Sequence, residues 1–301
     1  PGVLGPDGFA LSELGDQIFL SAGDGSGLAE PAYRESVEFG AAENNVTFGR
    51  YVKQNGTADF TAMAAPTMGA PNASPLVGSA VISEIMYNPT NGDFDFMELV
   101  NISGMPVHLY YPVHPANTWK ISGLGFAFPP LTTMAAGEVI VITEAEVQAF
   151  ISLYGLPGTV QVFGPCPASL DNGGENLALM KPGPPDESGV PYIVVDRVKY
   201  DDDAPWPLEA DGQGCSLERV VLPEYGNDYI NWQASSTAGG SPGTAAMSSA
   251  EERDQDGMAD AWEMKHPAAT HTTAAGDAAS NYEVVAAGTD PVGSAGVFKL
   301  R

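Results

Sequence analysis

The residues with the clearest capacity for chemistry form an acidic run near the end of the chain. This run reads Asp254-Gln255-Asp256-Gly257-Met258-Ala259-Asp260-Ala261-Trp262-Glu263. Ca²⁺ takes six to eight oxygen ligands at about 2.3–2.6 Å, and carboxylates at alternate positions of a turning loop converge on one ion. Gly257 permits the sharp turn, the carbonyl of Met258 adds an oxygen, and Glu263 closes the shell. The run therefore predicts a calcium site with the ligands Asp254, Asp256, Met258, Asp260 and Glu263, and a solvated acidic turn is the alternative.

The other groups of titratable residues favour a solvated surface over catalysis. The four histidines, at positions 108, 114, 266 and 271, lack a further ligand at zinc spacing. Asp201-Asp202-Asp203 could bind a cation or supply an acid/base pair for glycoside hydrolysis, but adjacent carboxylates after a strand usually form a solvated turn. The sequence contains no Gly-x-Ser-x-Gly, phosphate-loop or His-Glu-x-x-His motif. We expect that the protein is not an enzyme.

The charge balance limits the partners. The chain has 38 acidic against 12 basic residues, for a formal net charge of -26. Such a field repels nucleic acid and anionic membranes, because little positive charge is available to neutralise phosphates. Hydrophobic residues make up 44% of the chain, enough to bury a core. No run of 18 apolar residues occurs, so we expect no membrane span.

The pattern between residues 81 and 243 is that of many short strands. Apolar and polar residues alternate in runs bounded by Gly, Pro and Asn, which is typical of strands separated by tight turns. We expect strands at 81–87, 96–101, 138–142, 176–180, 192–200 and 216–220, and a short helix within 144–154. A set of this kind predicts an all-β protein with a β-sandwich.

An internal repeat links the first 72 residues to the second half of this segment. Four blocks recur in the same order: 12–20 parallels 171–179, 34–39 parallels 195–200, 46–51 parallels 215–220, and 60–71 parallels 232–243. Residues 1–77 therefore carry only the back half of a module. Half a sandwich exposes apolar faces and unpaired edges. The missing strands come either from an absent upstream part of the chain or from a neighbouring molecule by strand addition.

Segment 78–243 resembles the bacterial lamin-tail domain, an immunoglobulin-like sandwich. The resemblance rests on Ile82-Ser83-Glu84-Ile85-Met86-Tyr87-Asn88-Pro89, Phe96-Met97-Glu98-Leu99-Val100-Asn101, Leu170-Asp171-Asn172-Gly173-Gly174-Glu175, and Gly214-Cys215-Ser216-Leu217-Glu218. It implies lamin-tail-type sandwich modules in tandem. The family's usual Leu-x-Gly-Trp block is displaced by an insertion at 105–118, which leaves the geometry near Trp119 open.

Residues 254–301 are similar to thrombospondin type 3-like calcium repeats, joined to the sandwich by a linker at 244–253. This resemblance implies a small calcium-loop and helix segment at the C-terminus and adds Asp277 as a ligand. Ala278 and Ala279 stand where the family has Asp and Gly, so we expect one good Ca²⁺ site and one weak or absent site.

The lamin-tail alignment places Cys166 and Cys215 beside strands, where a disulfide could join them, and two free thiols are the alternative. We expect an extracellular or cell-surface structural protein that binds protein partners, by self-association or through neighbouring modules, and that forms a fibre or surface layer. One alternative is an accessory region of a larger secreted enzyme. Another is a carbohydrate-binding module that stacks cell-surface glycans on Tyr110, Tyr111 and Trp119.

Overall fold

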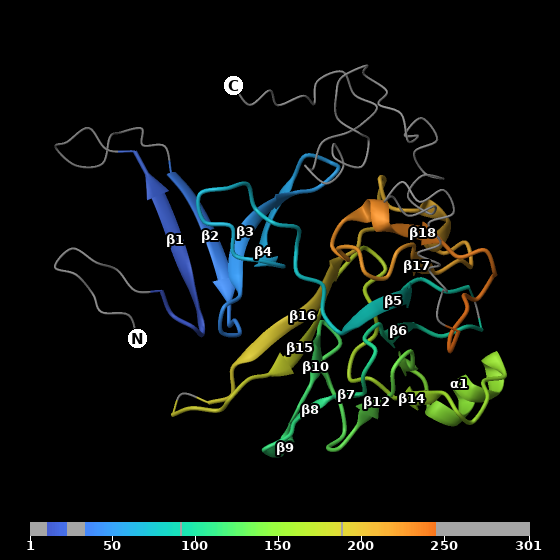
Figure 1. The fold of residues 1–301 in the computed structure, drawn as a ribbon. Helices are drawn as coiled ribbons and strands as arrows, with labels where there is room; N and C mark the ends of the chain where they lie inside the picture. Colours follow the sequence, from blue (N-terminus) through green and yellow to red (C-terminus); the bar gives the residue numbers. More distant parts are fainter. Residues whose placement is uncertain (1–10, 23–33, 91, 188, 245–301) are drawn as a thin grey trace.

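The computed structural model describes residues 11–22, 34–90, 92–187 and 189–244, and it is built almost entirely from strands (Figure 1). The strands predicted from the sequence are all present, and so is the helix, which confirms the all-β fold class. Within the described part of the chain, no helix is long and apolar enough to span a membrane.

Residues 74–244 form a two-layer sandwich, which we call the central sandwich. One sheet has six strands in the order β14-β13-β6-β5-β17-β18, and the other has four in the order β11-β10-β15-β16. The first sheet contains β5 (Ala80–Met86), β6 (Phe96–Asn101), β13 (Val139–Thr143), β14 (Gln161–Phe163), β17 (Leu217–Arg219) and β18 (Trp232–Ala234). The second contains β10 (Lys120–Ser122), β11 (Phe126–Ala127), β15 (Asn176–Pro182) and β16 (Tyr192–Lys199).

Strands β5 and β6 are buried along their whole length because both of their faces are covered. Their inner face packs against the four-stranded sheet in the main core. Part of their outer face lies under α1 (Val147–Tyr154), whose Phe150 ring meets that of Phe96 edge-on at 5.6 Å. This helix connects β13 to β14, the parallel pair of the sheet, as a parallel connection requires.

The insertion predicted at 105–118 folds into very short strands at one end of the sandwich. These are β7 (Val107–His108), β8 (Tyr110–Tyr111) and β9 (His114–Thr118), and β12 (Thr133–Met134) pairs with β7. Tyr110 pairs with Thr118 and Tyr111 with His114. The 3-10 turns Leu208–Ala210 and Tyr229–Asn231 flank β17 on the other side of the molecule.

Two further hairpins precede the central sandwich, and we call them the N-terminal hairpins. The first joins β1 (Gly15–Ser21) to β2 (Arg34–Gly40), and the second joins β3 (Thr47–Val52) to β4 (Ala58–Met63). Each forms a separate two-stranded antiparallel sheet. Both lie to one side of the central sandwich, drawn in blue in Figure 1.

Polar contacts hold the N-terminal hairpins against β16 and the loop after β17. Asp59 is the centre of these contacts: it lies 3.5 Å from Arg197 and accepts hydrogen bonds from Tyr225 and Asn227. A short parallel bridge between Ala41 and Ile193 adds a backbone contact.

Candidate functional site

The buried side of the central sandwich contains an ion pair that holds a strand by its backbone. Arg219 Nη1 lies 2.6 Å from Asp196 Oδ2, and the two side chains are 0% and 5% exposed. Between them lies Ile82 of β5, whose N–H donates to Asp196 Oδ2 at 2.8 Å and whose carbonyl accepts from Arg219 at 3.1 Å. The pair therefore fastens β16 and β17 to β5 through backbone atoms, which every residue except proline can supply.

Two buried glutamates, Glu84 of β5 and Glu98 of β6, hold the C-terminal segment of the sandwich by its backbone in a similar way. Glu84 accepts from the Ser216 hydroxyl at 2.5 Å and from the Ser241 N–H at 2.8 Å. Glu98 accepts from the Gly243 N–H at 2.8 Å. Burial raises the pKa of Glu84 to about 7, and burial together with the nearby Glu84 charge raises the pKa of Glu98 to about 8. Both carboxyls are enclosed and hydrogen-bonded, which suits a structural role.

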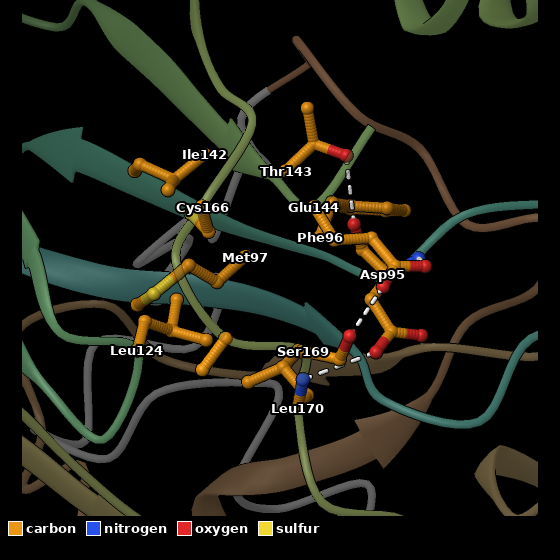
Figure 2. A pocket seen from close by; sticks show the side chains of 11 residues that line it. Asp95, Phe96, Met97, Leu124, Ile142, Thr143, Glu144, Cys166, Ser169 and Leu170 are labelled. Atoms are coloured by element: carbon orange, nitrogen blue, oxygen red, sulfur yellow. Dashed lines mark hydrogen bonds between the residues drawn. The ribbon is translucent and has the colours of Figure 1, made fainter. Parts of the chain in front are cut away.

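One small hollow opens where β6 begins and β13 ends, and it is lined by Asp95, Glu144, Cys166 and Ser169 among others (Figure 2). The Asp95 carboxylate accepts from the Leu170 N–H at 3.1 Å, and Ser169 donates to Glu144 at 2.5 Å. Burial, followed by the charge of Glu144, raises the pKa of Asp95 to about 7 and that of Cys166 to about 12. The Cys166 thiol is therefore protonated at neutral pH and a poor nucleophile. The hollow spans about 160 Å³, part of it open to solvent, which is below the roughly 300–1,000 Å³ of sites for organic ligands.

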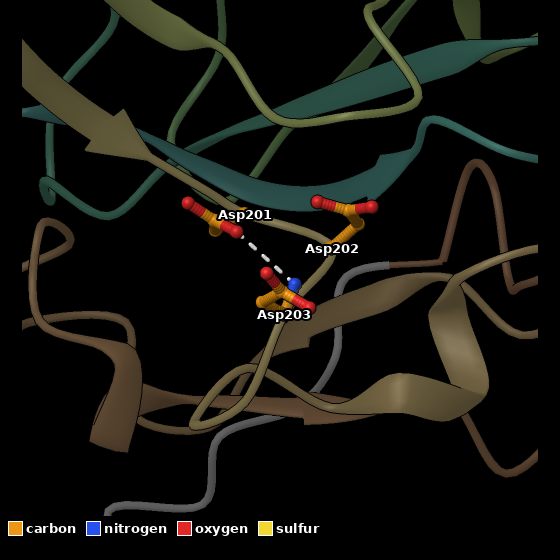
Figure 3. Close-up of side chains that lie close together, drawn as sticks. All are labelled: Asp201, Asp202 and Asp203. Carbon is orange, nitrogen blue, oxygen red and sulfur yellow. Dashed lines mark hydrogen bonds between the residues drawn. The ribbon is translucent and has the colours of Figure 1, made fainter.

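The acidic triplet forms a turn on the surface (Figure 3). Asp201, Asp202 and Asp203 have carboxylate oxygens within 4.8 Å of one another, the only such group of potential metal ligands in the part of the chain that the structure describes. The Asp203 N–H donates to Asp201 Oδ1 at 3.0 Å, so one carboxylate stabilises the turn itself. Asp203 is exposed.

The structure corrects two predictions about site residues. Trp119 is only 5% exposed and lies in the main core, so it is not available to stack on a glycan. Its backbone N–H donates to the carbonyl of Leu109, a buried residue of the insertion that belongs to the same core. Tyr110 and Tyr111 remain partly exposed, with ring centroids 5.2 Å from His108 and 5.9 Å from His114 respectively.

The predicted disulfide is wrong, because Cys166 and Cys215 are both free. The Cys166 N–H donates to Thr143 at the end of β13, whereas Cys215 lies just before β17. Strands β6 and β5 separate β13 from β17 in the sheet. At about 4.8 Å per strand this is roughly 14 Å, beyond the roughly 7 Å limit between bridged Cα atoms. The predicted calcium ligands at positions 254, 256, 258, 260, 263 and 277 lie outside the described residues.

The central sandwich is the part of the chain that matches a known protein family. Residues 74–202 match the family model described as Lamin Tail Domain. The match begins just before β5 and ends after β16, so it covers most of the sandwich, and it supports an immunoglobulin-like structural domain. No curated protein matches the chain.

Proposed function

We propose that this is a non-catalytic structural or interaction protein of the cell surface or extracellular space, whose modules associate with other polypeptides in a fibre or surface layer. The observation that carries the proposal is the uncovered apolar surface of the N-terminal hairpins. Leu20 is 65% exposed, whereas the equivalent Leu179 of the central sandwich is 0% exposed. Such a surface suits association with another protein.

Three further considerations agree with this proposal. The lamin tail domain is an immunoglobulin-like structural family. The hollow beside Asp95 is too small for an organic substrate, and its cysteine is protonated at neutral pH. The strongly acidic composition, with a net charge of -26, suits a protein that is exposed to calcium and other extracellular cations.

We propose in addition that Ca²⁺ binds to the acidic run that begins at Asp254 and stiffens the segment after the sandwich. The donor set is all oxygen, as Ca²⁺ prefers. Calcium in the extracellular space would keep this segment ordered, and its removal would loosen the spacing between neighbouring copies rather than unfold the sandwich.

Light scattering on the purified native protein tests the proposal. We expect particles several times the monomer mass of 31.3 kDa, and a change in their size distribution when calcium is chelated. The variant Leu20→Ser should reduce the mass, because it places a polar group on the uncovered surface. The matched control Leu153→Ser changes a leucine of α1 that is 47% exposed and should leave the mass unchanged. A monomer at all concentrations, with and without calcium, would refute self-association and favour an accessory region of a larger secreted enzyme.

A further inference from the structure

The N-terminal hairpins reproduce the back half of the central sandwich in their strand registers. Sequence alignment equates Ile18 with Leu177 and Val37 with Val198. The structure pairs Ile18 with Val37 across β1–β2, and Leu177 with Val198 across β15–β16. The turns agree as well: Gly15 and Gly174 have φ angles of +113° and +101°. A Cβ on either would lie 2.7 Å from a carbonyl oxygen of the partner strand, which only glycine tolerates.

The second hairpin shows the same agreement. Arg50 pairs with Phe60 across β3–β4, and Arg219 pairs with Trp232 across β17–β18. Alignment equates Arg50 with Arg219, and it equates Glu35 of β2 with Asp196 of β16. Arg50 Nη1 lies 3.0 Å from Glu35 Oε1. The ion pair that holds β5 in the central sandwich is therefore present a second time.

The two ion pairs differ in how far the surrounding chain buries them. The side chains of Arg219 and Asp196 are 0% and 5% exposed, whereas those of Arg50 and Glu35 are 61% and 42% exposed. Leu179 is 0% exposed and the equivalent Leu20 is 65% exposed. In the central sandwich β5 supplies the cover, because it pairs with β17 through Ile85 and Leu217 and places Ile82 in the ion pair. Among the described residues, β4 is the only strand that pairs with β3, and the Arg50 carbonyl accepts a hydrogen bond from the Asn72 side chain at 3.0 Å, which an added strand would replace.

We propose that the open face of the N-terminal hairpins is an acceptor site for one strand of a partner polypeptide, which adds to β3 and is held by Arg50 and Glu35. By analogy with Ile82, one residue of that strand donates its N–H to the Glu35 carboxylate and accepts from the Arg50 guanidinium through its carbonyl. The chain's own β5 is enclosed in the central sandwich and already pairs with β6 and β17, so it is not the strand that adds to β3. This inference rests on the proposed association function and names its contact.

The acceptor face is accessible because it is turned away from the central sandwich. Side chains alternate between faces along a strand. Arg50 and Phe60 are paired, and the next pair, Tyr51 and Asp59, lies on the opposite face. Tyr51 packs on Tyr225 at 5.2 Å, and Asp59 makes the ionic contact to Arg197, so that opposite face is the one held against the sandwich.

The surface also defines the chemistry of the strand. The rings of Phe39, Phe48 and Phe60 form a cluster with centroid distances of 5.3–6.5 Å, and all three are partly exposed. In the central sandwich two of the equivalent positions contact apolar residues of β5 or the residue that follows it: Leu217 pairs with Ile85, and Tyr200 packs on Tyr87 at 4.8 Å. The acceptor face therefore selects an extended strand with the β5 pattern, apolar on one face and without Pro at the clamped position.

A labelled synthetic peptide with the sequence of residues 78–89 tests the inference by fluorescence anisotropy against the full 301-residue chain. We expect saturable binding. Arg50→Ala should weaken it at least about tenfold, whereas Arg34→Ala should leave it unchanged, because Arg34 lies over the Phe19 ring on the other face of the hairpin. A peptide carrying Ile82→Pro lacks the clamped N–H and should also bind at least about tenfold more weakly.

Absence of saturable binding overturns the inference, and so does binding that Arg50→Ala leaves unchanged. The outcome is separate from that of the light-scattering experiment. Large particles with no peptide binding would mean that the protein assembles through another surface. Peptide binding by a chain that is always monomeric would support the acceptor site and refute self-association.

Discussion

Replacing Arg219 with alanine should destabilise the central sandwich far more than replacing its repeat equivalent, Arg50. Arg219 is fully buried, pairs with Asp196 at 2.6 Å, and also donates to the carbonyls of Ile82 and Glu224. Its removal leaves a buried carboxylate without its cation and two carbonyls without this donor. Breaking a buried ion pair by removing one partner costs about 3–5 kcal/mol. Arg50 is 61% exposed, and loss of an exposed pair costs about 0–1 kcal/mol.

Urea unfolding followed by tryptophan fluorescence measures this difference. Three of the four tryptophans, Trp119, Trp206 and Trp232, belong to the central sandwich, and the fourth, Trp262, lies outside the described residues. In a Trp262→Phe background the signal therefore reports on the sandwich. With a slope near 2 kcal/mol per molar urea, a loss of about 4 kcal/mol lowers the midpoint by about 2 M. Arg50→Ala should leave the midpoint nearly unchanged.

A double-mutant cycle with Asp196→Asn identifies the cause. Once the carboxylate is neutral, Arg219→Ala no longer leaves an unpaired charge, so its additional cost should be much smaller than in the native background. Equal losses for Arg219→Ala and Arg50→Ala, or additive losses in the cycle, would refute the assignment of Arg219 and Asp196 as a buried clamp.

Three other properties follow from the buried groups. The pKa values of Glu84 and Glu98 are raised from 4.5 to about 7 and about 8, so the folded state retains protons that the unfolded chain loses. The free energy of unfolding should therefore fall as pH rises from 5 to 8, and Glu84→Gln should make that fall smaller. A free energy of unfolding that rises over this range would contradict the raised pKa values. Ellman titration should find two free thiols per chain in denaturant under non-reducing conditions, and Cys166→Ser should not change the native labelling rate at pH 8, because the Cys166 pKa is raised to about 12. Trp119→Ala should cost about 3–5 kcal/mol of stability, and Tyr111→Ala little, in the same urea assay; equal small effects would place Trp119 outside the core.

The strands could be predicted from the sequence because their signal is local. Alternation and turn residues located β6 at Phe96–Asn101 and placed β5, β13 and β16 to within about a residue or two at each end. The helix was located too, although it begins at Val147, three residues after the predicted Glu144. The internal repeat could also be predicted from the sequence, because equivalent residues such as Gly15 and Gly174 both adopt a positive φ angle close to a carbonyl oxygen of the partner strand.

Burial and long-range pairing could not be read in the same way. Trp119 follows a Tyr- and Pro-rich insertion that suggests a surface, and only the position of Leu109 and the sheet beneath it places the indole in the core. The alignment put both cysteines beside strands but did not show which strands, and the sheet order separates them by β5 and β6. The clamp was missed because Arg219 and Asp196 lie on strands of different sheets, and nothing in the spacing joins them.

The two arginines show why sequence similarity alone does not fix a residue's role. Arg50 and Arg219 occupy equivalent positions, pair with equivalent acids and sit in equivalent registers, yet one is 61% exposed and the other 0%. The difference lies in β5, a strand that belongs to neither hairpin. A buried ion pair is costly unless its remaining hydrogen-bonding groups find partners. In the central sandwich the backbone of Ile82 bonds to both members of the pair and the Glu224 carbonyl accepts from Arg219, which leaves only the Arg219 Nε without a partner. Retention of the same pair at an uncovered site is therefore best explained by a strand that arrives from elsewhere and makes the same contacts.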